Sequence, residues 1–249
     1  MQYKYVKEQL DYSDLASGRV FHSLPGHPAF PIRLASEIFQ RCRAHRQAIY
    51  KTSTRCVLYD PCCGAGYHLS VLAYLHREHI QEVIASDIDE KAVALAQRNF
   101  DLVSVAGLDK RIAEIAQMSA LYGKASHKDA LRSAQILRDK TFTFAQEYPV
   151  KTQVFRANAI DSGEMMDNIK AKSVDLVFTD VPYGYHSLWQ GAEFINPLRA
   201  MLDALTNILS PSSFIAIASD KQQKVSHENY QRIEQFQIGK RRAVILKLV

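Results

Sequence analysis

The sequence predicts an α/β protein with a Rossmann-like, doubly wound sheet of seven mostly parallel strands. Apolar runs rich in β-branched residues alternate with helical patterns along the chain, and a glycine-bearing turn directly follows the first run. The 249 residues, 47% hydrophobic and 23% charged, have the size and composition of an ordinary folded protein. We therefore expect residues 1–249 to form a single domain.

Five short apolar runs are predicted to be strands, at residues 56–60, 82–86, 152–156, 173–178 and 213–218. Helical spacing fills the intervals between them at residues 69–79, 90–102 and 196–209. Two further strand-like runs, residues 230–237 and 241–248, are separated only by Ile238, Gly239 and Lys240. This spacing predicts a C-terminal antiparallel hairpin.

Two segments depart from this alternation. Residues 104–148 interrupt the step between a helix and the third strand with polar, charged sequence of helical type, which predicts a helical insertion. Residues 1–54 precede the first strand and contain a turn-rich stretch, residues 23–31, followed by helical spacing over residues 32–43. We expect this N-terminal segment to cap the ligand-binding edge of the sheet.

The segment from Asp60 through Pro61 and Cys62 to Gly64 and Gly66 ends the first predicted strand and precedes a helix. Such a turn places backbone N–H groups at the carboxyl edge of a parallel sheet, where adenosine-containing ligands bind. The two glycines allow a tight turn and let a ligand lie close to the backbone. We therefore expect this segment to hold a cofactor.

Acidic and amide side chains follow the next two strands on the same edge. Asp87 ends the second strand, with Ile88 and Asp89 behind it, and its carboxylate can accept hydrogen bonds from both ribose hydroxyls. Asn158 and Ala159 follow the third strand, where Asn158 can hydrogen-bond an adenine edge. A helix cap for Asp87 and a plain turn for Asn158 remain alternatives.

The glycines alone do not decide which adenosine ligand binds. A dinucleotide fingerprint has a third small residue where this chain has Leu69, and the run begins with Asp60 and Pro61. Asp87 serves NAD and S-adenosylmethionine alike. A dehydrogenase therefore remains an alternative to a methyltransferase at this step.

The segment that follows the fourth predicted strand points to the reaction. Its residues Asp180, Val181, Pro182 and Tyr183 resemble the signature of class I methyltransferases that act on exocyclic amines, with Val181 in place of a proline. In such a site Asp180 accepts an N–H hydrogen bond, a carbonyl of the turn at Pro182 accepts a second, and Tyr183 stacks on the base. The resemblance implies S-adenosylmethionine as methyl donor.

An aromatic loop follows this motif. Tyr185 and Trp189 offer faces on which a flipped base could stack, although Trp189 equally suits a surface loop over the core. His186 is a further candidate for proton removal. We expect substrate contacts in this loop.

The N-terminal segment carries a second resemblance. Residues 27–33 are similar to the motif with which these methyltransferases close over the methionine end of the donor. The resemblance implies that Phe30 and Arg33 lie at the donor, with Arg33 meeting its carboxylate. A solvated charge is the alternative for Arg33.

Taken together, the motifs resemble one family across nearly the whole chain, the avilamycin-resistance ribosomal RNA methyltransferases. The resemblance is carried by residues 14–22, 27–40, 60–66, 84–89 and 179–184. It implies a guanine of large-subunit (23S) ribosomal RNA as substrate and avilamycin (orthosomycin) resistance as the role. Neither composition nor spacing indicates that substrate by itself.

The charge of the chain agrees with an RNA partner without requiring one. The net charge is +5 and the pI is about 8.9. Basic side chains gather at Arg41, Arg43, His45, Arg46 and Lys51 and at Lys240 to Arg242. Phosphate contact and a solvated surface explain either group equally well.

We expect a cytoplasmic protein with reduced thiols, no metal and no membrane partner, and a monomer is the favoured state. The start of the chain lacks the apolar core of a signal peptide, and no run approaches the roughly 18 apolar residues that span a bilayer. The four cysteines form no paired C-x-x-C spacing, so Cys62 and Cys63 are interpreted as small fillers.

Two alternatives to a ribosomal RNA methyltransferase remain. The same chemistry can act on another nucleic acid or on a protein side chain. A protein of another class, an RNA-binding module with a vestigial donor cavity, can also keep the fold. The presence of Gly64, Gly66, Asp87 and Asp180 favours an active enzyme.

Overall fold

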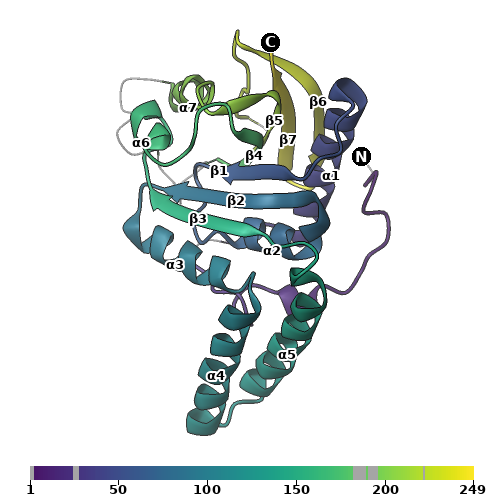
Figure 1. Ribbon diagram of the computed structural model, residues 1–249, viewed down its shortest axis with the longest axis vertical. Helices are drawn as coiled ribbons and strands as arrows, with labels where there is room; N and C mark the ends of the chain where they lie inside the picture. The colour runs from purple at the N-terminus through teal and green to yellow at the C-terminus, as the bar shows by residue number, and fades with distance from the viewer. Residues whose placement is uncertain (1–2, 25–27, 182–188, 190–195, 221) are drawn as a thin grey trace.

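The computed structural model describes residues 3–24, 28–181, 189, 196–220 and 222–249. Pro182, Tyr183, Tyr185 and His186, all predicted at the site, lie outside these residues. The centre of the fold is a seven-stranded sheet with the order β3-β2-β1-β4-β5-β7-β6 (Figure 1). Its strands are β1 (Cys56–Asp60), β2 (Ile80–Asp87), β3 (Lys151–Arg156), β4 (Val174–Asp180), β5 (Leu209–Asp220), β6 (Tyr230–Ile238) and β7 (Arg241–Leu248).

The pairing confirms the predicted sheet. β1 to β5 are parallel, and β7 joins β5 and β6 in antiparallel fashion, so the last two strands form the expected hairpin. β5 is longer than predicted because its first residue, Leu209, pairs with Val174 at the start of β4. The predicted helix over 196–209 therefore ends earlier, at Leu205.

Helices cover both faces of the sheet. They are α1 (Ile32–Tyr50), α2 (Tyr67–Leu75), α3 (Glu90–Asp101), α4 (Val105–Tyr122), α5 (Ala125–Ala145), α6 (Ser162–Met166) and α7 (Pro197–Leu205), with short 3-10 turns at Ser13–Leu15 and Arg77–His79. α6 and the 3-10 turn at Ser13–Leu15 were not predicted. The predicted helix over 69–79 is divided at His76, which ends α2.

Alternate side chains of β4 point to opposite faces of the sheet, and each face has its own hydrophobic core. Leu176 and Phe178 point into the cluster that contains α1, α2 and α3, whereas Val177 points into the cluster that contains α6 and α7. β4 is buried on both faces, as parallel strands between helices are. The sheet is therefore doubly wound, as predicted.

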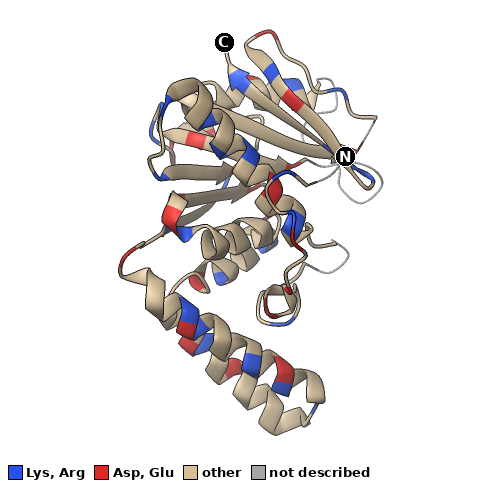
Figure 2. Cartoon of the chain, turned by 90° about the vertical axis from the view of Figure 1, so that its right-hand side faces the viewer, with Lys and Arg blue, Asp and Glu red and all other residues tan. Residues whose placement is uncertain are grey.

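The insertion is a hairpin of two helices that projects away from the sheet (Figure 1). Leu108 and Ile115 of α4 and Ala134 of α5 pack in a third cluster with Phe21 of the N-terminal segment. Both signs of charge are distributed along the two helices (Figure 2). The division of the chain into an N-terminal cap, residues 1–54, and an insertion, residues 104–148, remains a prediction.

Two members of the predicted basic group, Arg41 and Arg46 of α1, lie inside the molecule. Arg41 is 3% exposed and forms ion pairs with Glu37 and with Glu234 of β6, which also binds His45. Arg46 is buried and its Nη2 lies 2.7 Å from Asp175 Oδ1. These side chains fasten α1 to the sheet. The two buried arginines are therefore not available for contact with RNA phosphates.

None of the helices in the described part of the chain is long and apolar enough to cross a membrane.

Arg77 holds both ends of the insertion. Its Nη2 donates to the carbonyl of Val103 before α4, at 2.5 Å, and its Nη1 donates to the carbonyl of Tyr148 after α5, at 3.3 Å. Arg77 is 5% exposed, so both carbonyls would lose a charged donor in a buried place if it were removed.

We expect Arg77→Met to lower the free energy of unfolding by about 2 to 3 kcal/mol, because hydrogen bonds from charged donors are lost where water cannot replace them. Urea denaturation followed by circular dichroism measures the change. Arg98→Met is the control, because the Arg98 side chain is 54% exposed and its ion pair with Glu114 is long, at 3.8 Å. Equal stability of the two variants would contradict this role of Arg77.

Candidate active site

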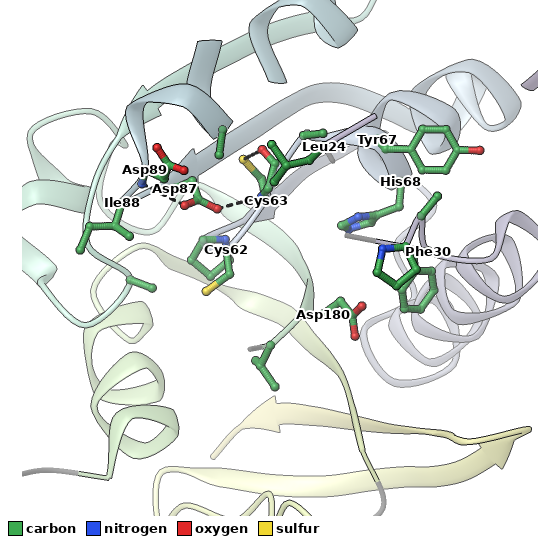
Figure 3. Close-up of a pocket in the computed structure, with 18 of the residues that line it drawn as sticks. Leu24, Phe30, Cys62, Cys63, Tyr67, His68, Asp87, Ile88, Asp89 and Asp180 are labelled. Carbon is green, nitrogen blue, oxygen red and sulfur yellow. Dashed lines mark hydrogen bonds between the residues drawn. The ribbon is translucent and has the colours of Figure 1, made fainter. Parts of the chain in front are cut away.

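A cavity of about 500 Å³ lies at the carboxyl edge of the sheet (Figure 3). The ends of β1, β2, β3 and β4 and the N-terminal segment contribute to its wall. The predicted residues that line it are Phe30, Pro61, Cys62, Gly64, Asp87, Ile88, Asp89, Asn158, Ala159, Asp180 and Trp189. These eleven are fewer than half of the 24 described residues that line the cavity.

The glycine loop adopts backbone conformations that favour glycine. Gly64 and Gly66 have φ angles of +53° and +63°, in the left-handed region. Gly66 precedes α2 and does not line the cavity, and a Cβ there would lie 3.0 Å from Cβ of Ala96 on α3. Gly66 therefore allows α2 and α3 to approach each other, whereas Gly64 lies at the cavity itself.

Asp87 joins the glycine loop to the end of β2. Its Oδ2 accepts the N–H of Gly64 at 2.8 Å and its Oδ1 accepts the N–H of Asp89 at 3.1 Å (Figure 3). Asp89 caps α3 by accepting from Lys91. A carboxylate has about four acceptor positions, so Asp87 keeps capacity for ligand hydroxyls after making these bonds. Burial raises its pKa.

Asp60 lies beneath the loop and does not line the cavity. It is fully buried, and its Oδ1 accepts the N–H of Cys62 at 2.9 Å. His68 of α2 places Nε2 3.4 Å from Asp60 Oδ2 and 3.3 Å from the carbonyl oxygen of Phe178. Burial raises the pKa of Asp60 to about 8 and lowers that of His68 to about 4. At neutral pH this pair is therefore mostly uncharged, which avoids the cost of a buried charge.

Asp180 ends β4 on the opposite side of the loop. Its Oδ2 accepts from Nη1 of Arg241 at 3.1 Å. Burial raises the pKa of Asp180 to about 6, although the charge of Arg241 lowers it. At neutral pH Asp180 is ionised and is a stronger base than an ordinary aspartate.

The N-terminal segment closes one side of the cavity. Phe30 is 5% exposed and packs edge-on against Phe178 of β4, with ring centroids 5.4 Å apart. Asn99 of α3 holds the segment in place: it donates to the carbonyls of His22 and Ala65 and accepts the N–H of His22. The structure therefore ties the N-terminal segment directly to the glycine loop.

Arg33 requires a correction, because it does not line the cavity. Its guanidinium donates to the carbonyl of Val6 at 3.0 Å and to that of Lys7 at 2.7 Å, and it lies over the ring of Tyr3. Arg33 thus joins Tyr3 and the backbone of Val6 and Lys7 to α1. Its position does not support the predicted contact with a donor carboxylate.

Asn158 and Trp189 do reach the cavity, but both have structural roles as well. Asn158 Oδ1 accepts the N–H of Ile160 at 3.3 Å, which is a turn contact. Trp189 packs against the core cluster that contains α7. Contacts of either residue with a ligand remain predictions.

All four cysteines are free, and burial raises the pKa of Cys62 and Cys63 well above the ordinary value. Thiolate catalysis by either residue is therefore disfavoured. Within the described residues, no group of three or more His, Cys, Asp or Glu side chains is arranged to hold a metal ion.

Several residues at this site were missed from the sequence, among them His68, which lines the cavity, and Asn99, which supports the glycine loop. Arg241 was predicted only as part of a basic group, and its place in the cavity wall was missed. The signal for Asn99 was an amide on the apolar face of a predicted helix, and that for His68 was a histidine directly after the glycine loop. No local signal placed Arg241 at the cavity, because it comes from the C-terminal hairpin.

We expect Gly66→Ala to destabilise the protein more than Gly64→Ala. Each substitution places a Cβ in the left-handed region, at a cost of roughly 1 kcal/mol. At Gly66 the new methyl group also meets Ala96, whereas no heavy atom lies within 4 Å of the Cβ position at Gly64. Thermal unfolding of both variants measures the difference, and equal melting temperatures would contradict this account of the loop.

Comparisons with known proteins show the family of this chain. The family model described as rRNA methyltransferase AviRa matches residues 1–241. The chain is 37% identical over 245 residues to the 23S rRNA (guanine(2535)-N(1))-methyltransferase of Streptomyces viridochromogenes, covering 98% of this chain and 95% of that protein. A solved structure of rRNA methyltransferase AviRa from the same organism, 36% identical, superposes with a TM-score of 0.87 over 99% of this chain and 96% of that one. The family predicted from the sequence is therefore confirmed: the chain belongs to the AviRa family of ribosomal RNA methyltransferases.

Proposed function

We propose that this protein transfers a methyl group from S-adenosylmethionine to ring nitrogen N1 of a guanine in 23S ribosomal RNA. The observation that carries the proposal is that Asp180, an ionised carboxylate, lines the same cavity as Gly64 and Asp87. The similarity to the 23S ribosomal RNA guanine N1-methyltransferase supports the choice of base and atom. We also propose that the protein acts in the cytoplasm, and the proposed ribosomal substrate supports this location.

The cavity fits the methyl donor in size and in chemistry. Its volume of about 500 Å³ lies within the range of roughly 300 to 1,000 Å³ that is usual for small-molecule sites. Gly64 leaves room at the loop, and Asp87 offers acceptors for ribose hydroxyls. Asp89 and the backbone around Ile88 and Ala159 complete this side of the proposed donor site.

The charges on the wall favour a sulfonium over a dinucleotide. Asp87, Asp89 and Asp180 line the cavity with carboxylates, and Arg241 offsets one of them. Carboxylates repel the two phosphates of a dinucleotide and attract a sulfonium cation. This argues against the dehydrogenase alternative.

When bound, S-adenosylmethionine supplies an electrophilic methyl group on a positively charged sulfur. Guanine N1 carries a hydrogen and is a poor nucleophile until that proton leaves. Asp180 accepts the N1–H hydrogen bond and then the proton, as a general base positioned at the end of β4. Its raised pKa, about 6, makes it a stronger proton acceptor that is still ionised at neutral pH.

We further propose that a flipped guanine stacks on the aromatic residues that follow Asp180. Tyr183, Tyr185 and Trp189 are the candidates, and the carbonyl of the Val181 to Pro182 turn accepts a second N–H from the base. Trp189 lies in the cavity wall, which supports this arrangement. From the family resemblance, we also propose that the methylation contributes to avilamycin resistance.

We expect Asp180→Asn to lower methyl transfer to 23S ribosomal RNA by at least about 100-fold, because an amide cannot accept the N1 proton. Transfer of tritiated methyl groups measures the rate, and calorimetry with S-adenosylhomocysteine checks that donor binding is kept. Asp167→Asn, the same change at the exposed C-terminal end of α6, is the control. Transfer by Asp180→Asn at the rate of the unmodified protein would overturn the assignment.

The single-turnover rate should fall as the pH drops through about 6, the pKa of Asp180. The sign follows from the role: the ionised form accepts the proton, so activity is present above the pKa and is lost below it. A rate profile between pH 4.5 and 8.5 tests this. An acidic limb near pH 4 would show that another group, or an unperturbed carboxylate, controls the step.

Supplying tritiated donor to ribosomal RNA, DNA and protein fractions separates the acceptor classes. Label in ribosomal RNA supports the proposal, whereas label confined to DNA or protein overturns it. Tight RNA binding with no label in any fraction would favour the non-catalytic RNA-binding module.

A further inference from the structure

Arg241 reaches Asp180 from the C-terminal hairpin, 61 positions further along the chain. Its Nη1 lies 3.1 Å from Asp180 Oδ2 and 3.5 Å from Oδ1, and both residues line the cavity. The register explains the meeting: Asp180 pairs with Ala218 of β5, and Arg241 pairs with Asp220 at the end of the same strand. The turn before β7 therefore stands at the carboxyl edge where β4 ends.

Phe30 contacts the same guanidinium from the N-terminal segment. The Arg241 guanidinium carbon lies 4.9 Å from the centroid of the Phe30 ring, a cation–π contact. The Arg241 side chain is 18% exposed. Asp180 and Phe30 thus contact the guanidinium from two separate elements, which restricts its position beside the carboxylate.

Among the described residues, the other titratable groups around this pair do not replace Arg241 as a cation. Asp60 at the end of β1 is a carboxyl group, and Asp220 at the end of β5 accepts the N–H of Gln222. His68 of α2 is neutral at pH 7, because burial lowers its pKa to about 4. Burial raises the pKa of Asp180, and the charge of Arg241 opposes that rise.

We propose that Arg241 is a positioning residue of the methyl transfer, which holds the Asp180 carboxylate ionised and directed into the cavity. The proposal rests on the proposed function of Asp180. In the step, the N1–H bond of guanine breaks and its proton passes to an Asp180 oxygen. N1 forms the bond to the methyl carbon, and the electron pair of the broken carbon–sulfur bond stays on sulfur.

The same ion pair helps Asp180 to lose its proton after the transfer. A guanidinium beside a carboxyl group favours its ionised form. Protonated Asp180 therefore returns its proton to water more readily with Arg241 in place than without it. The C-terminal hairpin thus supplies the positive charge of Arg241 to the reaction. Among the described residues, Arg241 is the one side chain of the hairpin that lines the cavity.

The first test needs neither donor nor RNA. Aspartate carboxyl carbons labelled with ¹³C are titrated by NMR, with Asp180→Asn used to assign the Asp180 signal. We expect a midpoint near pH 6 in the unmodified protein and an upward shift of roughly 1 pH unit in Arg241→Gln. Arg241→Lys, which keeps the charge, should shift the midpoint less.

Lys247→Gln is the matched control, because Lys247 lies on the same strand and the same face as Arg241 but near the other end of β7. It removes the same charge and should leave the Asp180 midpoint in place. An unchanged midpoint in Arg241→Gln would overturn the proposal. Thermal unfolding checks that each variant is folded at the titration temperature.

The second test is the pH profile of transfer to 23S ribosomal RNA. With a midpoint raised by 1 unit, Arg241→Gln should be on the order of 5-fold slower than the unmodified protein at pH 6 and nearly equal at pH 8.5. A loss of equal size at every pH would indicate a merely structural role and overturn the proposal. If the NMR midpoint shifts but the unmodified protein transfers no methyl group, the proposed function fails while the link from Arg241 to Asp180 stands.

Discussion

The position of β1 between two parallel strands determines which side chains share the cavity. β1 pairs with β2 on one side and with β4 on the other, so the chain reverses the direction in which it adds strands at this point. The loop after β1 leaves the sheet at this switch point, where ligands bind in open α/β sheets. It therefore lies between Asp87 at the end of β2 and Asp180 at the end of β4.

Backbone hydrogen bonds hold the loop in that position. The N–H of Cys63 donates to the carbonyl of Ser86 at 3.0 Å, and the N–H of Gly64 donates to Asp87 at 2.8 Å. Both bonds join the loop to β2. The methyl donor is proposed to lie on this side of the cavity, and the acceptor base on the side of Asp180.

Differences in burial give Asp60 and Asp180 different protonation states and therefore different roles. Asp60 is fully buried and mostly protonated at neutral pH, which suits a support beneath the loop. The Asp180 side chain is 24% exposed and faces Arg241, so it stays ionised and accessible. Two aspartates at the ends of adjacent strands thus carry different charges because their surroundings differ.

Local sequence patterns predicted the strands and the residues that directly follow them. Strand alternation and the glycine turn placed β1 with its correct bounds and brought Gly64, Asp87 and Asp180 to one edge. Long-range contacts were beyond such patterns. Arg33 was assigned to the donor because nothing local showed that the carbonyls of Val6 and Lys7 would occupy its guanidinium.

The roles of Arg241 and Asn99 at the site were missed for the same reason. The role of Arg241 depends on the register of β5 with β7, and that of Asn99 depends on the path of the N-terminal segment past α3. The start of α4 is likewise fixed by a single capping bond, from the N–H of Gly107 to Ser104 Oγ. Caps and registers are set by a few hydrogen bonds that composition does not reveal.

The central claim is that Asp180 accepts the N1 proton of a guanine while the methyl donor lies against the glycine loop. The most direct measurement is mass spectrometry of nucleosides from 23S ribosomal RNA treated with the protein and a deuterated methyl donor. The account predicts a deuterated 1-methylguanosine that is absent when Asp180→Asn is used. Deuterium in N2-methylguanosine, or in a nucleoside other than guanosine, would contradict it.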